Sequence, residues 1–300
     1  MPASSGNARI GLALGSGGAR VWSHIGVIEA LHDMGVKPEV VCGTSIGALV
    51  GTVYAAGDLE RLERWVRGLS RRNVLQLMDV AWRGGLIKGR RLFDFFAANI
   101  EDRNLAALAM PCGVVATDLA TGREIWLREG PMLEAVHASI AMPGLFTPIE
   151  RDGMLLVDGG LVNPVPVSMC RALGAEVVIA VDLGWAKFGR FRPRVDAAPS
   201  GLRAPSWLDR LTRLVRRGEV SEAEQRRSAP SIVEAMLTSV DIMQVRVARS
   251  RLAGDPAEVM VTPLLPDFAT MDFHRAAEAI AEGRAAVARA RPMLERMMEV

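Results

Sequence analysis

The feature that most constrains the fold is a strand, glycine turn and helix that occur twice near the start of the chain. The apolar run Ile10–Leu14 ends in Gly15-Ser-Gly-Gly18 and is followed by apolar residues at helical spacing. The apolar run Val40–Cys42 likewise ends in Gly43-Thr-Ser-Ile-Gly47, and a second helical stretch follows. A repeated alternation of strand and helix is typical of a parallel sheet. We therefore predict an α/β fold.

The later sequence continues with further strands and helices. Asn163-Pro164 predicts the start of a helix. The Asn side chain can cap the free N–H groups of the first turn, and Pro fits the first helical position because a backbone N–H there would have no partner within the helix. A stripe of apolar residues that includes Met236 and Met243 lies along a long predicted helix, and we expect it to face the core. We expect strands at 113–117, 124–127, 154–157, 177–181 and 258–262, and helices within 59–100 and over 132–141, 231–252 and 273–298.

We expect the whole chain, residues 1–300, to form a single domain. Its catalytic core would span about 9–184, and a C-terminal helical region would span about 231–300. Between them, residues 185–230 are rich in Lys, Arg and Pro, which indicates an exposed basic insertion or linker. Within this segment, Trp207–Arg217 places apolar residues on one helical face and arginines elsewhere. Such a stretch is a candidate for contact with a membrane surface, or else a solvated helix of the same domain.

Composition excludes several classes of protein. The net charge is +2, half of the residues are hydrophobic and 23% are charged, which is ordinary for a globular protein. No basic stretch is interleaved with aromatic residues, so we expect no nucleic-acid partner. The cysteines Cys42, Cys112 and Cys170 are odd in number and lack ligand spacing, which argues against both a disulfide scaffold and a metal site.

The N-terminal residues lack the basic segment, apolar run and cleavage site of a signal peptide, and no window approaches the ~18 apolar residues of a membrane span. We therefore expect a cytoplasmic protein. If its substrate is a lipid, the protein must reach that lipid from the aqueous side. It would then be peripheral at the inner membrane surface.

Gly43-Thr-Ser45-Ile-Gly47 fits the nucleophile elbow of serine hydrolases. A serine on a sharp turn from strand to helix projects its hydroxyl from the edge of the sheet, and flanking glycines allow the backbone to pass closely. The alternative is a tight turn with an ordinary serine.

Acyl transfer also requires N–H donors for an oxyanion, and the turn after the first strand could supply them. The candidate donors are Gly15, Ser16, Gly17, Gly18, Ala19 and Arg20. A phosphate-binding turn is less consistent with the sequence, because Val21 stands where a dinucleotide fingerprint has glycine.

The candidate base is Asp158, which ends a predicted strand and precedes Gly159 and Gly160. An isolated Asp-Gly is more often a simple turn, so this assignment depends on its context. Only His274 would complete the Ser-Asp-His order of α/β-hydrolases, and it lies at the start of the last predicted helix. A triad esterase or thioesterase that uses His274 therefore stays open as an alternative. The remaining histidines are His24 and His32 on the first predicted helix and His137 within a later one.

Taken together, these segments resemble the patatin-like phospholipase family, in particular its bacterial branch related to the catalytic domain of neuropathy target esterase. The resemblance covers about 9–183 and rests on five segments in the family's order. They are Leu12-Ala-Leu-Gly-Ser-Gly-Gly-Ala-Arg20 with Ser23-His-Ile-Gly-Val27, Gly43-Thr-Ser-Ile-Gly47, Ala116-Thr-Asp-Leu-Ala-Thr-Gly122, Ser139-Ile-Ala-Met-Pro-Gly144 and Val157-Asp-Gly-Gly-Leu-Val-Asn-Pro164.

The resemblance implies a three-layer sandwich with a mostly parallel central sheet flanked by helices. It also implies a Ser45–Asp158 dyad, an oxyanion hole around Gly17 and Gly18, and hydrolysis of acyl esters of phospholipids or lysophospholipids without calcium, other metal or cofactor. Two residues depart from the family loop: Ser16 replaces a glycine, and Val21 replaces the glycine after Arg20. A β-branched residue resists positive φ. A patatin-fold regulatory module with little or no activity is therefore a further alternative.

Overall fold

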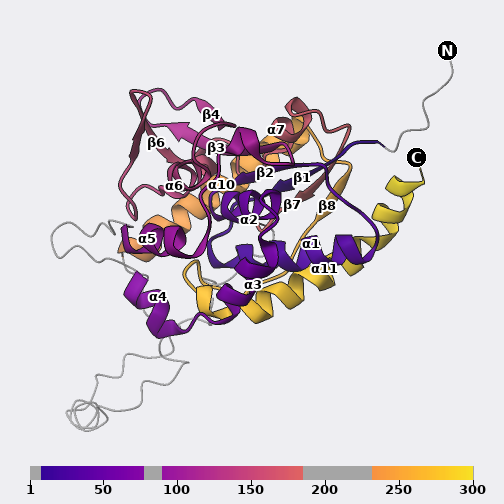
Figure 1. Cartoon of the computed structure of the whole chain (residues 1–300), viewed down its shortest axis with the longest axis horizontal. Coiled ribbons are helices and arrows are strands. Elements are labelled where there is room, and N and C mark those ends of the chain that lie inside the picture. Colours follow the sequence, from indigo (N-terminus) through magenta and orange to yellow (C-terminus); the bar gives the residue numbers. More distant parts are fainter. Residues whose placement is uncertain (1–7, 78–89, 185–231, 300) are drawn as a thin grey trace, which may run out of the picture.

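The computed structural model describes residues 8–77, 90–184 and 232–299. Their strands form one eight-stranded sheet with helices on both sides (Figure 1). The strands are β1 Ile10–Leu14, β2 Val40–Thr44, β3 Cys112–Asp118, β4 Glu124–Leu127, β5 Ile149–Arg151, β6 Met154–Asp158, β7 Val177–Val181 and β8 Val259–Val261. Their order is β5-β6-β3-β2-β1-β7-β8, with β4 also paired to β3.

The centre of the sheet is parallel and one side of it is antiparallel. β1 pairs in parallel with β2 and β7, and the parallel pairs β2–β3 and β7–β8 extend the sheet on both sides. β4 and β6 run antiparallel to β3, and β5 runs antiparallel to β6. The predicted mostly parallel sheet and each of its predicted strands are confirmed. The three-residue strand β5 was not predicted, because Ile149-Glu-Arg151 contains two charged residues and so lacks an apolar run.

The helices cover both faces of the sheet. They are α1 Ser23–Asp33, α2 Ile46–Ala55, α3 Leu59–Arg67, α4 Arg71–Leu77, α5 Arg90–Asn99, α6 Met132–Ile140, α7 Val167–Ala172, α10 Ile232–Gly254 and α11 Ala276–Met298. Short 3-10 helices are η1 Gly18–Trp22, η2 Leu105–Ala107, η3 Gly159–Leu161 and η4 Phe273–Arg275. The predicted insertion at 185–230 lies outside the described residues.

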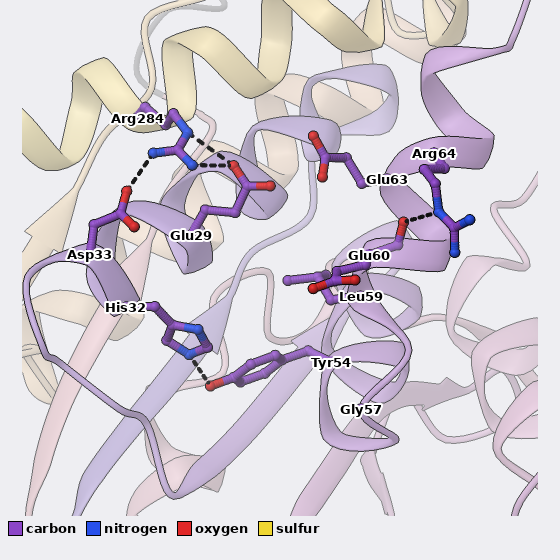
Figure 2. Close-up of a pocket in the computed structure, with 10 residues that line it drawn as sticks. All are labelled: Glu29, His32, Asp33, Tyr54, Gly57, Leu59, Glu60, Glu63, Arg64 and Arg284. Carbon is purple, nitrogen blue, oxygen red and sulfur yellow. Dashed lines mark hydrogen bonds and ion pairs between the residues drawn. The ribbon is translucent and has the colours of Figure 1, made fainter.

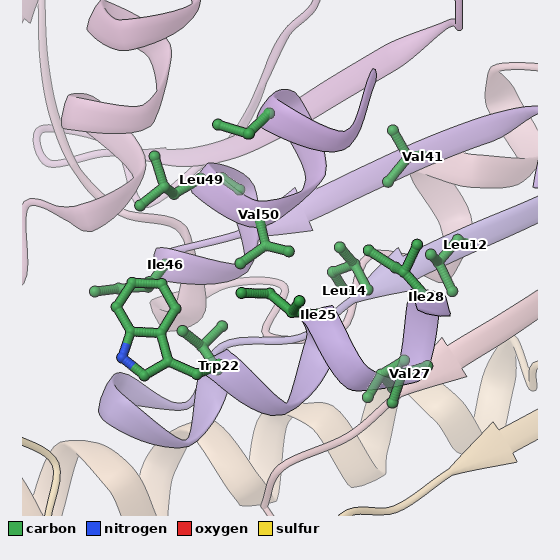
Figure 3. Close-up of a cluster of buried hydrophobic side chains, with 14 of the residues drawn as sticks. Leu12, Leu14, Trp22, Ile25, Val27, Ile28, Val41, Ile46, Leu49 and Val50 are labelled. Atoms are coloured by element: carbon green, nitrogen blue, oxygen red, sulfur yellow. The ribbon is translucent and has the colours of Figure 1, made fainter. Parts of the chain in front are cut away.

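Alternate residues of β1 belong to two different apolar clusters. Leu12 and Leu14 pack in the larger cluster with side chains of α1, α2, α6 and α11, part of which is shown in Figure 3. Ala13 points to the opposite face, where it joins the smaller cluster with residues of α7 and with Ala248 of α10. Since successive side chains of a strand point to opposite faces, helices must cover both. The predicted three-layer sandwich is confirmed.

The C-terminal helix α11 packs on α1 with almost no space between the two backbones. A Cβ built on Gly26 of α1 would lie 1.9 Å from the carbonyl oxygen of Ile280, and one on Gly283 of α11 would lie 2.0 Å from that of Ser23. Both distances are far below any real contact, so only glycine fits at these crossing points. The edge of the same helix pair is joined by ion pairs from Arg284 (Figure 2).

A cleft with a volume of about 620 Å³ is lined by α1, the C-terminal end of α2, α3 and α11. Figure 2 shows the side chains that line it. Arg284 binds Glu29 at 2.9 Å and Asp33 at 2.7 Å within it. Burial raises the pKa of the Glu29 carboxyl, and a hydrogen bond with Glu63 acts in the same direction. His32 and the Tyr54 hydroxyl are 2.9 Å apart along another wall. The charged groups of this cleft thus mainly join α1, α3 and α11 to one another.

Two local predictions were wrong. α7 begins at Val167 rather than after Asn163, whose side-chain Nδ2 donates to Glu124 over 2.7 Å and to Ser168 over 3.2 Å. The apolar stripe of α10 does not face the core: Met236 and Met243 are about half exposed. The buried face of this helix is instead formed by Gln244, Val245 and Ala248, because α10 covers the sheet only along its C-terminal half. The three cysteines are free and buried.

The contact between α1 and α11 leads to a stability prediction. Gly26→Ala and Gly283→Ala should each lower the free energy of unfolding by about 1–3 kcal/mol or more, because a methyl group forces the helices apart. Chemical denaturation followed by circular dichroism measures the change. Gly254→Ala is the matched control, since that glycine has open space around its Cβ position. Equal stability of all three variants would contradict the tight backbone contact.

Candidate active site

Ser45 lies between the end of β2 and the start of α2, where the backbone turns sharply. Its φ of 57° and ψ of −134° are in a region that non-glycine residues rarely adopt. Such a conformation costs on the order of 1–3 kcal/mol and is found where function requires it. The turn directs the Ser45 hydroxyl toward β6, and Ser45 is only 5% exposed. This is the geometry of a nucleophile elbow.

The partner of the Ser45 hydroxyl is the carboxylate of Asp158. Ser45 Oγ donates to Asp158 Oδ2 over 2.7 Å, although the two residues are 113 positions apart. The Gly160 N–H donates to the other oxygen, Oδ1, also over 2.7 Å. Asp158 is fully buried. Both carboxylate oxygens are therefore held, and one of them faces the serine.

The backbone of Asp158 is fixed by its neighbours in the sheet and by α6. Its N–H donates to the carbonyl of Ala141 over 3.0 Å. Its carbonyl accepts from the Thr117 hydroxyl of β3 over 2.8 Å. Asp158 also lies opposite Ala116 in the antiparallel β3–β6 ladder. These contacts fix the backbone position of Asp158 at the end of β6, and thereby the place from which its carboxylate extends.

Ser139 of α6 supports the Ser45 turn, a role that the sequence did not indicate. Its hydroxyl accepts from the Ser45 N–H over 2.8 Å and donates to the Val115 carbonyl over 2.6 Å. The side chain is fully buried. This two-sided contact ties the strained turn to β3. Its position at the start of the Ser139–Gly144 motif was the one signal that could have identified it.

The predicted oxyanion loop contains six residues, and three of their N–H groups are already used by the fold. Gly15, Ser16 and Ala19 donate to the carbonyls of Val181, Pro164 and Thr270 at 2.8–3.0 Å. For the amides of Gly17 and Gly18, by contrast, no acceptor is found within the described residues. The Arg20 N–H lies inside the 3-10 helix η1, where N–H groups pair with the carbonyl three residues earlier. The set of candidate donors therefore narrows to Gly17 and Gly18, at the start of η1.

Buried polar side chains fix the shape of this loop. Arg20 donates to the Gly17 carbonyl over 3.4 Å and to the Phe268 carbonyl over 2.8 Å, so it contributes through its side chain. Gly18 has a φ of +57°, and a Cβ there would lie 2.7 Å from Thr270. Val21 lies within η1 without positive φ and is buried in the core. The replacement of a glycine by Val21 therefore causes no backbone conflict.

The two glycine turns contact each other directly. A Cβ on Gly47 would lie 2.6 Å from the carbonyl oxygens of Leu14 and Gly15. The other motif glycines are equally crowded: a Cβ would lie 2.5 Å from Ala48 at Gly43, 2.1 Å from the Val115 carbonyl at Gly159 and 2.5 Å from Gln244 at Gly160. Close approach of another part of the backbone explains the glycine at positions 43, 47 and 159, whereas the side chains of Gln244 and Asp158 crowd Gly160.

His24 stabilises the oxyanion loop and is neutral. Its Nε2 lies 2.8 Å from the Gly15 carbonyl, which fixes the tautomer with hydrogen on Nε2. Complete burial lowers the pKa of His24 to about 4. His274, the candidate for a triad, accepts instead from Arg71 over 3.0 Å on the surface. The structure thus places Asp158 in contact with Ser45. His274 contacts Arg71 instead.

The described residues contain no group of His, Cys, Asp or Glu placed to hold a metal ion. Nor does any helix among them combine the length and apolar character that a bilayer crossing requires. The arrangement offers a buried serine, a carboxylate that can take its proton, and two free N–H groups on a neighbouring turn. Such a set can catalyse acyl transfer.

Comparison with known proteins gives matches to a family profile, to curated relatives and to a solved structure. A family profile described as patatin-like phospholipase matches residues 12–171. An uncharacterized NTE family protein of Mycobacterium tuberculosis is 33% identical over 94% of this chain and 91% of its own. Patatin-like phospholipase domain-containing protein 6 of Homo sapiens is 33% identical over 58% of this chain and 13% of its own. VipD from Legionella pneumophila aligns with a TM-score of 0.47 and 14% identity, over 97% of this chain and 67% of that one.

The neutral His24 predicts a pH dependence of stability. Its folded pKa of about 4 lies below the ordinary value of 6.5, so the unfolded chain binds the proton first. Stability should be complete above pH 6.5 and should fall between pH 6.5 and 4, by up to about 1.4 kcal/mol per unit for this group. His24→Gln keeps a donor for Gly15 but does not titrate.

Denaturation curves at several pH values should therefore show a flatter dependence for His24→Gln than for the wild type. Burial also lowers the pKa of His137 to about 4. His137→Gln should therefore also reduce the loss of stability between pH 6.5 and 4, separately from His24→Gln. Identical pH dependence of wild type and His24→Gln would show that His24 does not stay neutral in the folded protein.

Proposed function

The chain belongs to the patatin-like phospholipase family, and from this membership and the geometry at Ser45 we propose that it cleaves acyl esters of phospholipids or lysophospholipids with a Ser45–Asp158 dyad. At the level of the family, it is a lipolytic acyl hydrolase. The observation that carries the finer proposal is the 2.7 Å hydrogen bond from the Ser45 hydroxyl to the buried Asp158 carboxylate. A nucleophile and its base must be within this distance.

In the proposed reaction, Ser45 Oγ attacks the acyl carbonyl carbon while its proton passes to Asp158 Oδ2. The carbonyl oxygen becomes an oxyanion, which the N–H groups of Gly17 and Gly18 stabilise. The ester C–O bond then breaks, and Asp158 returns the proton to the departing alcohol oxygen. This leaves an acyl-serine. A water molecule attacks it with Asp158 again as base, releasing the fatty acid and restoring Ser45.

A carboxylate is an inherently weak base toward a hydroxyl, because the ordinary pKa of Asp is near 4. The proposal therefore requires that most of the developing charge be stabilised elsewhere. Three features support this. Asp158 is fully buried, Gly17 and Gly18 offer free N–H groups, and Ser45 is already in its strained conformation before substrate binds.

Exposed apolar side chains favour a lipid as substrate. On α10, Met236, Ile242 and Met243 are 42–54% exposed, on the same helix that reaches the site with the buried Gln244. Methionine side chains adapt to flexible apolar ligands. The reaction as proposed needs no calcium, because every step uses groups of the chain and water. We also propose that the chain is one domain, since β8 extends the sheet that contains β1.

Location and membrane contact stay proposals. A cytoplasmic enzyme with peripheral contact at the inner membrane surface would fit a lipid substrate. The segment predicted to provide that contact, Trp207–Arg217, lies outside the described residues. Sedimentation with liposomes, for the full chain and for a variant without residues 190–228, would test it. Equal binding of both proteins to the liposomes would exclude the segment.

The dyad leads to a direct prediction. Ser45→Ala and Asp158→Asn should each lower kcat for a lysophospholipid by at least about 1000-fold, because each removes a group that forms or breaks bonds. Both variants should remain folded by circular dichroism. Ser239→Ala and Asp152→Asn are matched controls on exposed surfaces and should retain full activity. An active Asp158→Asn would disprove the dyad and return attention to His274.

A fluorophosphonate probe separates a catalytic protein from a non-catalytic module of the same fold. It should label the native wild type at Ser45, as mapped by mass spectrometry. It should not label the heat-denatured protein or Ser45→Ala, since an unactivated serine does not react. A native wild type that resists labelling would favour the regulatory alternative.

A further inference from the structure

Gln244 of α10 is a buried polar residue that none of the motifs contains. It is 3% exposed and lies well beyond the profile match that ends at residue 171. Its Oε1 accepts a hydrogen bond from the Ser16 hydroxyl of the oxyanion loop over 3.0 Å, between residues 228 positions apart. Its other polar atom, Nε2, is buried and has no hydrogen-bond partner among the residues that the structure describes.

The unpaired Nε2 faces the turn that carries the base. The position that a Cβ on Gly160 would occupy lies 2.5 Å from Nε2 of Gln244 and 2.9 Å from Oδ1 of Asp158. The side-chain amide of Gln244 and the carboxylate of Asp158 thus lie on either side of the Gly160 Cβ position. Gln244 spans the site, with its oxygen on the loop of the oxyanion donors and its nitrogen beside the base.

The orientation of this amide follows from its surroundings. A hydroxyl such as that of Ser16 can pair with either end of an amide. If the amide were reversed, however, its carbonyl oxygen would face the Asp158 carboxylate, where two acceptors repel. The N–H groups therefore point to the Asp158 side. Leaving a buried donor unpaired costs about 1–3 kcal/mol, and such groups are rare unless something satisfies them.

The half of the substrate that must come near Asp158 is the alcohol. The Asp158 carboxyl returns its proton to the departing alcohol oxygen, so the carbon chain of that alcohol lies beside it. A donor next to Asp158 therefore meets the alcohol half of the ester. In a glycerolipid, this half carries further oxygens on neighbouring carbons, which can accept a hydrogen bond.

We propose that Gln244 binds the alcohol half of the substrate, and that its Nε2 donates a hydrogen bond to an oxygen of a glycerol-type alcohol. The inference rests on the dyad proposed above. Ser16 is a positioning residue in this arrangement, because its hydroxyl holds the far end of the amide. Ser16 stands where the family loop commonly has glycine, so the pair distinguishes this chain from that pattern.

The experiment compares two esters of the same fatty acid, one of glycerol and one of ethanol, in the same detergent micelles. The ethyl ester lacks the additional oxygens. Gln244→Met should lower kcat/KM for the glycerol ester about tenfold, as expected for one lost hydrogen bond, and leave the ethyl ester within about twofold. Ser239→Ala on the same helix is the control. A similar loss with both esters, or with neither, would overturn the proposal.

Ser16→Ala tests the positioning role and also replaces Gln244→Met if that variant does not fold. It should lower kcat/KM for the glycerol ester several-fold, with the ethyl ester again within about twofold. In the double variant, Ser16→Ala should add little to Gln244→Met, because both act through one contact. Additive losses would show that Ser16 does not act through Gln244.

Fluorophosphonate labelling of Ser45 in every variant separates the two proposals. The probe contains no glycerol, so Gln244→Met and Ser16→Ala should be labelled at the rate of the wild type. A wild type that is not labelled contradicts the dyad. Normal labelling in all variants, with no selective loss for the glycerol ester, contradicts the role of Gln244 alone.

Discussion

The site depends on the parallel pairing of β1 and β2. Parallel neighbours end at the same edge of a sheet, so the turns that follow them leave side by side. Here the contact is between backbones, with Gly47 of the second turn against the carbonyls of Leu14 and Gly15. Hydrogen bonds with Ser139 of α6, Gln244 of α10 and Thr270 of the C-terminal region keep these two turns next to each other.

Much of the fold and the core of the candidate site could be predicted from local patterns. Apolar runs and glycine turns gave the predicted strands of the sheet. Ser45 and Asp158 were chosen because each lies where a strand meets a glycine turn, and the structure places them in contact. The contact itself depends on the register of the sheet: β6 runs antiparallel to β3, and Asp158 pairs with Ala116, next to the Val115 that pairs with Thr44 of β2.

Residues whose partners are distant in sequence could not be found in this way. Ser139 acts 94 positions from Ser45, and Gln244 acts 228 positions from Ser16. Neither pairing leaves a periodic or spacing signal. The helix start predicted after Asn163 was also wrong, and the side chain of Asn163 instead donates to Glu124 of β4. Met243 was misplaced because periodicity shows that a helix has an apolar face but not whether a partner covers it.

The attachment of the oxyanion loop to the C-terminal region has a consequence for synthesis on the ribosome. Arg20 and Ala19 bind the carbonyls of Phe268 and Thr270, and Gly26 packs against α11. A nascent chain that has emerged only as far as Asp158 contains both members of the dyad but lacks the residues that shape the donor turn. The turn with the proposed oxyanion donors therefore reaches its final shape only after the C-terminal region has been synthesised.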